Sequence, residues 1–298
     1  MPSLKAIRKR IASTKATQKI TRAMKMVAGA RLTRAQQRIV AMRPYALKTG
    51  EVLQSVSRTI GSSDPSQTEA VHPLLARRPE KRALLLVFSA DRGLCGALNT
   101  NVNKNAERFW REKESGSIEV SFATLGRKGR EFLNRRRGNV TKDFPRVYDG
   151  LDLEKARLVA HWLVPRFERG EFDAVYVVYN EFKSAITQKI TLERLLPLGE
   201  PEARDGADAA APTDFIYEPD QRALLERLVP MYVEISVYRA LLESQASFFG
   251  AQMTAMDAAT RNAKDMIARL TLVYNRARQA AITKELMEII GGAEALKD

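Results

Sequence analysis

Cysteine and histidine are scarce in this chain of 298 residues, which contains one cysteine, Cys95, and two histidines, His72 and His161. A single cysteine excludes an internal disulfide and a cysteine-based metal cluster, and the histidines have no metal-ligand spacing. We therefore expect no metal or other cofactor, and a reducing, cytosolic-side location.

Long apolar runs are also missing. No stretch of 18 apolar residues occurs, so the sequence predicts no transmembrane helix and no direct membrane insertion. The first residues, Met1-Pro2-Ser3, are not followed by the apolar core of a secretory signal.

Acidic residues are absent from residues 1–50, which carry 13 Lys and Arg of a chain with a net charge of +14. Such asymmetry indicates an anionic partner: nucleic acid, an anionic membrane face or acidic protein loops. Aromatic side chains that would accompany nucleic-acid binding are nearly absent, since Tyr45 is the only one before Phe88. The pattern favours a solvated coiled-coil face or a face turned to acidic protein. A coiled-coil nucleic-acid-binding protein with an α/β domain remains the alternative.

Proline is absent from residues 231–298, and small or apolar residues recur there at spacings of three, four and seven. They are Leu242, Phe249, Met256, Ala259, Ala263, Met266, Leu270, Val273, Ala277 and Ala280. These spacings form the narrow stripe of a coiled-coil seam, on a helix of roughly 90 Å from residue 231 to residue 290. A helix of that length needs a partner helix.

Residues 3 to about 60 predict that partner. Ser3 is a suitable N-cap, and Pro44 is expected to bend or break the helix locally. The expected apolar face comprises Leu4, Ile7, Ile11, Ile20, Ala23, Met24, Val27, Ala30, Ile39, Met42, Ala46, Thr49, Leu53, Val56 and Ile60. We therefore predict that the two ends of the chain wind together antiparallel.

The middle of the chain alternates short apolar runs with helical patterns, as in an open, mostly parallel sheet. The predicted fold class is α/β plus a long antiparallel coiled coil, with both terminal helices paired as a shaft beside a Rossmann-like domain. The expected parts are a shaft helix over 1–61, an α/β foot over 82–196, a flexible connection over 197–219 and a second shaft helix over 220–298.

No stretch of the sequence predicts a catalytic site. The turn over residues 89–97 has two glycines but neither spacing of a phosphate-binding loop, which favours a tight strand-to-helix turn. Cys95 in that turn is interpreted as a small buried core residue. The carboxylate pair Glu285 and Glu288 is interpreted as a solvated helix face. A nucleotide-binding α/β domain with helical arms remains a third hypothesis.

Two stretches at opposite ends of the chain resemble the gamma subunit of F-type ATP synthases. The first runs from Leu4 to Ala28, and the second, from Tyr274 to Ala293, contains the family's signature. The signature positions are Ile282, Thr283, Glu285, Glu288, Gly292 and Ala293. The turn Asp91-Arg92-Gly93-Leu94-Cys95-Gly96 with Leu98-Asn99 matches as well.

The resemblance implies a non-catalytic central-stalk rotor of a bacterial proton-translocating enzyme, peripheral to the cytoplasmic face of the cell membrane. Its implied partners are the alpha and beta subunits of the catalytic hexamer, the epsilon subunit and the membrane c-subunit ring. The rotor would transmit rotation of the ring to the hexamer for ATP synthesis or hydrolysis and regulate ATPase activity and ion flow. The implied contacts to the hexamer, including acidic loops of beta, are Met24, Lys25, Gln279, Thr283 and Glu285.

Overall fold

The computed structural model describes residues 3–63, 72–198 and 221–294. Two long helices, α1 (Leu4–Ser63) and α5 (Gln221–Glu294), come from the two ends of the chain. Between them lie η1 (Pro73–Leu75), β1 (Arg82–Phe88), α2 (Leu98–Ser115), β2 (Glu119–Leu125), α3 (Arg127–Arg135), β3 (Asn139–Phe144), α4 (Leu153–Glu168), β4 (Ala174–Phe182) and β5 (Gln188–Leu196). The chain forms two compact units, one of residues 1–29 with 252–298 and one of residues 30–251.

The second unit contains a five-stranded sheet with the order β3-β2-β1-β4-β5. The pairs β1–β2, β1–β4 and β2–β3 are parallel, and β5 runs antiparallel to β4 at one edge. Central strand β1 is buried from Ala83 to Phe88, as its continuous apolar run predicts for a strand covered on both faces. The predicted mostly parallel α/β fold is confirmed.

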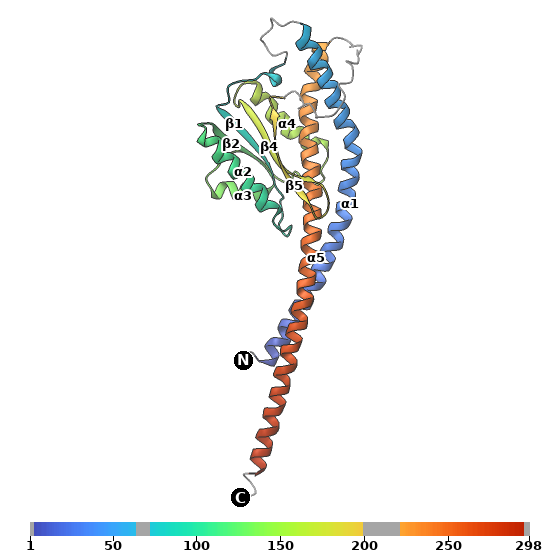
Figure 1. Ribbon diagram of the computed structural model, residues 1–298, viewed down its shortest axis with the longest axis vertical. Coiled ribbons are helices and arrows are strands. Elements are labelled where there is room, and N and C mark those ends of the chain that lie inside the picture. The colour runs from blue at the N-terminus through green and yellow to red at the C-terminus, as the bar shows by residue number, and fades with distance from the viewer. Residues whose placement is uncertain (1–2, 64–71, 199–220, 295–298) are drawn as a thin grey trace. The chain divides into compact units, whose positions relative to one another are not determined.

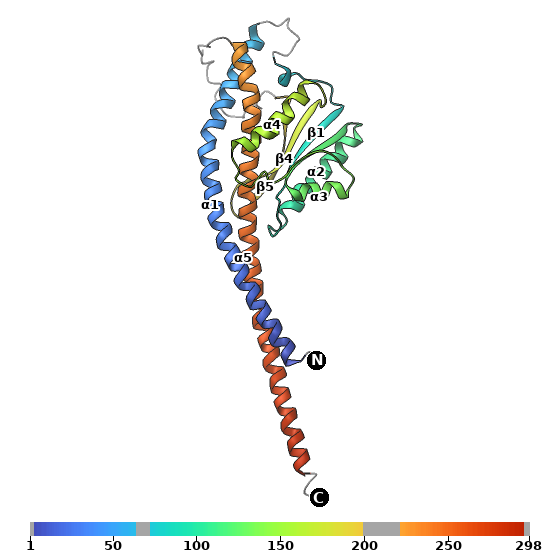
Figure 2. The same ribbon diagram turned by 180° about the vertical axis from the view of Figure 1, so that it is seen from behind.

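Helices cover both faces of this sheet, with α2 and α3 on one side and α4 and the first part of α5 on the other (Figures 1 and 2). Because side chains alternate along a strand, Leu85 and Val87 of β1 pack with Val102, Ala106 and other residues of the α2 side. The alternate residues of β1, Leu84, Leu86 and Phe88, are fully buried on the opposite face. The strand ends are therefore held between two helical layers.

Local signals place several of these elements where the sequence predicts them. The Asp152 side chain accepts a hydrogen bond of 3.1 Å from the Lys155 backbone N–H and caps α4. The Ser3 hydroxyl accepts one of 3.3 Å from Ala6 N–H before α1. Of the bend or local break predicted at Pro44, the break does not occur, because α1 continues through this residue. One proline removes a single backbone hydrogen bond, which the packing of the neighbouring turns offsets.

Helices α1 and α5 pair antiparallel within each unit. In the second unit the Arg31 guanidinium lies 5.8 Å from the centre of the Phe249 ring, and the Tyr45 hydroxyl lies 3.5 Å from the Met231 sulfur. In the first unit Thr14 contacts Met266. Within each unit, contacting residues with higher numbers on α1 have lower numbers on α5, so the two helices run antiparallel. The predicted pairing of the two chain ends is confirmed.

The face that α1 turns to α5 in the first unit agrees with the predicted one at Leu4, Ile7 and Ile11 and departs from it farther along the helix. Ile20 and Val27 are 60% and 52% exposed, and Ala23 is exposed as well. The side chains that recur every three or four residues and are buried or half-buried are Ile7, Ile11, Thr14, Gln18, Thr21, Lys25 and Ala28. Four of these positions are polar, so the apolar pattern points to a face displaced by one residue, or about 100° around the helix.

On α5 the predicted stripe is confirmed in part. Met256 and Ala263 are buried and Ala259, Leu270 and Ala277 half-buried, whereas Met266, Val273 and Ala280 are exposed. The predicted connection over 197–219 lies outside the described residues from 199 onward. No helix in the described ranges is both long and apolar enough to cross a membrane.

Candidate functional site

The five predicted contact residues lie in the first unit but in two separate groups. Met24 and Lys25 lie on α1 opposite Asp257, whereas Gln279, Thr283 and Glu285 lie near the end of α5. At the rise of an α-helix, the 22 residues from Asp257 to Gln279 correspond to about 33 Å. The structure therefore places the five predicted residues in two separate candidate contact regions rather than at one site.

The first region is built around an ion pair that sequence reasoning missed. Lys25 Nζ lies 2.6 Å from Asp257 Oδ1, and Arg261 Nη2 lies 3.3 Å from Asp257 Oδ2. The hydrogen bond from Lys25 lowers the pKa of the Asp257 carboxyl. Both side chains of the 2.6 Å pair are partly exposed, so water screens it and its main effect is to orient Lys25. Met24 is half-buried beside it.

A pair of hydroxyls lies one helical turn away from this ion pair. Thr260 Oγ1 lies 2.9 Å from Thr21 Oγ1, and Thr21 is only 9% exposed. Each hydroxyl also lies within hydrogen-bonding distance of a carbonyl of its own helix, Thr21 of Gln18 at 3.1 Å and Thr260 of Met256 at 2.7 Å. Continuing from Ile7 and Ile11 in steps of three and four residues, with polar residues allowed, leads to Thr21.

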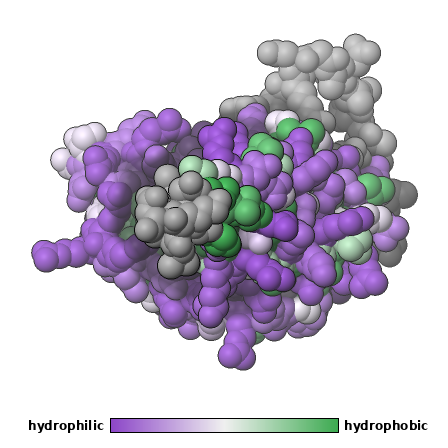
Figure 3. Space-filling view, turned by 90° about the horizontal axis from the view of Figure 1, so that it is seen from below, coloured by the Kyte–Doolittle hydropathy of each residue, from purple (hydrophilic) through white to green (hydrophobic). Residues whose placement is uncertain are grey.

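The second region is the end of α5, which continues as a single helix past the N-terminal end of α1 (Figures 1 and 2). Its large apolar side chains are mostly exposed: Ile282 45%, Leu286 53%, Met287 64%, Ile289 67% and Ile290 59%. Figure 3, which views the molecule from this end, shows hydrophobic side chains exposed among mostly hydrophilic ones. An apolar surface of this kind on one helix indicates a binding surface for another protein.

The signature residues lie on this same segment. Thr283 Oγ1 donates a hydrogen bond of 3.0 Å to the Gln279 carbonyl of its own helix, and Lys284 pairs with Glu288 at 3.5 Å. Glu285 and Gly292 are exposed, and the Ala293 side chain lies outside the described residues. These residues can pack and form hydrogen bonds.

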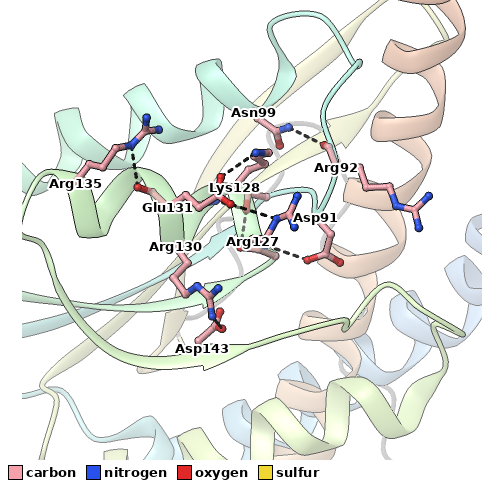
Figure 4. Close-up of polar contacts among 12 residues, drawn as sticks. Asp91, Arg92, Asn99, Arg127, Lys128, Arg130, Glu131, Arg135 and Asp143 are labelled. Atoms are coloured by element: carbon pink, nitrogen blue, oxygen red, sulfur yellow. Dashed lines mark hydrogen bonds and ion pairs between the residues drawn. The ribbon is translucent and has the colours of Figure 1, made fainter.

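The matching turn after β1 in the second unit has a structural explanation. Asn99 Oδ1 accepts from Ala90 N–H at 2.9 Å, and Asn99 Nδ2 donates to the Arg92 carbonyl at 3.2 Å (Figure 4). Cys95 is 2% exposed, and burial raises the pKa of its thiol. The predictions of a tight turn and of a buried core cysteine are confirmed.

A second turn, after β2, packs directly against the first. Gly126 has φ +104°, and a Cβ there would lie 2.0 Å from the Ser89 carbonyl oxygen. The Ser89 hydroxyl in turn accepts a hydrogen bond of 2.7 Å from Gly129 N–H at the start of α3. Only glycine fits this close approach of two backbones.

Three cations beside these turns are paired with acids (Figure 4). Arg127 and Lys128 lie 3.2 and 2.8 Å from the two oxygens of Glu131, and Arg130 lies 2.7 Å from Asp143. The hydrogen bond from Lys128 lowers the pKa of Glu131. Neither a phosphate-binding glycine loop nor, among the described residues, a group of three or more potential metal ligands occurs here.

Comparison with known proteins identifies the family of this chain. The profile of a family described as ATP synthase matches residues 3–296. The ATP synthase gamma chain of Sorangium cellulosum (strain So ce56) is 56% identical, and that of Geobacter sp. (strain M21) is 50% identical. Both alignments cover 100% of this chain and 100% of the relative.

Solved structures share the fold at lower identity. A chain of the Euglena gracilis mitochondrial ATP synthase (OSCP/F1/c-ring, rotational state 3) has a TM-score of 0.65 and 20% identity, covering 98% of this chain and 94% of that one. A chain of the Tetrahymena thermophila mitochondrial ATP synthase central stalk/c-ring has a TM-score of 0.60 and 24% identity, covering 80% and 99%.

None of these comparisons supports the nucleic-acid-binding alternative. The full-length matches reach both ends of the chain. This chain belongs to the ATP synthase gamma chain family.

Proposed function

We propose that this chain is the central-stalk rotor subunit of a bacterial proton-translocating F-type ATP synthase. It transmits rotation of the membrane c-subunit ring to the catalytic alpha-three beta-three hexamer, for ATP synthesis or hydrolysis, and thereby regulates ATPase activity and ion flow. The single observation that carries the proposal is the end of α5, a lone helix with exposed apolar residues in a chain of this family.

The end of α5 supports contact with the hexamer. A helix that exposes five large apolar side chains gains free energy when a surrounding surface buries them. Gln279, Thr283 and Glu285 lie on that segment and supply hydrogen-bonding groups beside the apolar ones. The proposed role of these residues is packing and hydrogen bonding that differ as the helix turns within three equivalent beta subunits, which biases otherwise equal sites.

The region of Met24 and Lys25 is the proposed contact to acidic loops of beta. The first 50 residues carry no acid, and Lys25 is oriented by Asp257 while 44% of its side chain stays exposed. An acidic loop can approach this face without repulsion from α1. The contact is electrostatic, so its strength falls as the salt concentration rises.

The foot over residues 82–196 is the proposed contact to the epsilon subunit and the c-subunit ring. The chain then lies at the cytoplasmic face of the membrane and takes part in catalysis without a catalytic site of its own. The absence of a phosphate-binding loop in the α/β foot fits this non-catalytic role.

Isolation of native complexes from membranes with an antibody against this chain tests the proposal. The expected preparation contains alpha, beta and epsilon subunits and the c-subunit ring and hydrolyses ATP. Recovery of the chain alone, or with nucleic acid and without alpha and beta subunits, would refute the rotor function.

A further inference from the structure

A cavity of about 200 Å³ lies in the second unit at the carboxyl ends of β1 and β4. Strand β1 is central, and the chain leaves it toward β2 on one side and later returns to β4 on the other. In open α/β sheets, the crevice beside such a reversal of strand order is where ligands bind. Residues of the turn after β1, of the β3–α4 connection, of β4 and of α5 line the cavity.

The cavity collects polar atoms that have no partner. Four buried side-chain polar atoms in the described part of the chain lack a hydrogen-bond partner, and three of them line this cavity. They are the Tyr148 hydroxyl, Asn180 Nδ2 and the Ser244 hydroxyl, and the two hydroxyls face each other closely enough to interact. Unpaired buried polar groups are costly and rare, so three around one cavity indicate that a ligand or water completes them.

The remaining walls define what kind of molecule fits. Phe88, Phe248 and Phe249 contribute aromatic surface in addition to the Tyr148 ring. A cavity of about 150 Å³ is large enough to hold benzene, so the present one accommodates a ring with polar substituents. Aromatic walls favour a flat molecule, because rings pack face-to-edge or offset against one another.

Charge at the cavity is balanced, since Arg31 and Arg92 are matched by Asp91 and Asp149. Arg92 points toward α5 (Figure 4). Asp91 Oδ1 accepts a hydrogen bond of 3.0 Å from Arg127 N–H, so the backbone donor at the start of α3 is already occupied. A bare phosphate would therefore find no backbone cradle, and a purely apolar molecule would leave the three polar atoms unpaired.

We propose that this cavity binds a small, uncharged, planar heteroaromatic molecule of the nucleobase class. Its ring lies against the aromatic walls, its acceptor takes the Asn180 amide hydrogen, and its other polar atoms bond to the hydroxyls of Tyr148 and Ser244. This site is separate from both contact regions of the rotor and does not depend on them.

Nuclear magnetic resonance of the ¹⁵N-labelled full chain tests the proposal, with adenine and uracil as heteroaromatic probes. Phenol, an aromatic ring without ring nitrogens, and inorganic phosphate are the comparison probes. The expected result is a saturable shift of the Asn180 side-chain amide signal with a nucleobase. Tyr148→Phe and Ser244→Ala are each expected to weaken that binding about tenfold, because each removes one buried hydrogen-bonding group.

Tyr179→Phe is the matched control, since Tyr179 is a buried tyrosine of β4 that does not line the cavity. It is expected to leave nucleobase binding unchanged. The proposal is overturned if neither nucleobase gives a saturable shift, which would mean that the cavity holds only water. Equal binding of phenol or phosphate, or equal weakening by the control, would overturn it as well.

Discussion

Ile289 at the end of α5 offers the sharpest test of how the shaft engages the hexamer. The side chain is 67% exposed in the chain by itself. Full burial of an isoleucine side chain contributes about 1.5–3 kcal/mol, so burying the exposed two-thirds contributes about 1–2 kcal/mol. Ile289→Ala is therefore expected to weaken binding to the alpha–beta hexamer about 5- to 30-fold.

The variant separates binding from folding. Ile289 makes few contacts in the isolated chain, and alanine favours a helix more than isoleucine does. The unfolding temperature of Ile289→Ala should therefore match that of the unchanged chain. The assay is titration of a purified alpha–beta hexamer with labelled chain, which gives the dissociation constant for each variant.

Ile186, in the turn between β4 and β5, provides a control of the same residue type because it is 81% exposed but lies on the foot. Ile186→Ala should leave hexamer binding unchanged. Equal affinity of Ile289→Ala and the unchanged chain would refute the reasoning, and so would equal weakening by both variants.

Three further predictions concern coupling and the stability of the foot. Met24→Lys adds a charge to the proposed beta contact and should lower the number of protons pumped per ATP hydrolysed, measured in vesicles containing the whole complex. Gly126→Ala forces a Cβ to 2.0 Å from the Ser89 carbonyl at φ +104° and should cost about 3 kcal/mol or more in unfolding free energy, measured in urea. Asp173 is expected to make the unfolding free energy fall in acid. Burial raises the pKa of its carboxyl, but hydrogen bonds from the backbone of Arg82 and Lys81 outweigh this effect and hold the pKa below the ordinary 3.8.

The sign of the acid effect follows from that lowered pKa. The contribution of Asp173 is complete above pH 3.8 and is lost as the pH falls through the lower folded-state value. Asp173→Asn should therefore flatten the pH dependence of the unfolding free energy in this range, and an unchanged slope would contradict it.

Gly150→Ala is the control for Gly126→Ala, since it has φ +60° but open space around it and should cost only about 1 kcal/mol. Equal costs at both glycines, or full coupling in Met24→Lys, would count against those two predictions.

The sheet could be predicted because its signals are local. The β1 run of Ala83 to Phe88 is apolar at every position, and Asp152 precedes α4 with the side chain that a helix start requires. The antiparallel pairing of α1 with α5 also follows from sequence, since neither long helix can bury its stripe alone. These features depend on the spacing of one kind of side chain.

The face of α1 in the first unit could not be predicted in the same way. Thr21 and Lys25 occupy seam positions, where they contact Thr260 and Asp257 of the other helix. A search for apolar residues selects Ile20 instead, which is exposed. Polar seam positions become visible only when both helices are considered together.

The cavity beside β1 and β4 was also out of reach of the sequence. Tyr148 lies in the β3–α4 connection, Asn180 on β4 and Ser244 on α5, and together they form no motif. Their relation depends on the order of strands in the sheet, which spacing along the chain does not reveal.

Direct observation of rotation tests the central claim of a rotor. Replacing buried Cys95 by alanine and exposed Ile186 by cysteine gives one accessible thiol on the foot, to which a visible probe can be attached. The hexamer of the assembled enzyme is fixed to a surface and ATP is added. The account predicts that the probe turns in one direction in three steps per revolution. A probe that stays still while the same molecules hydrolyse ATP would contradict the account.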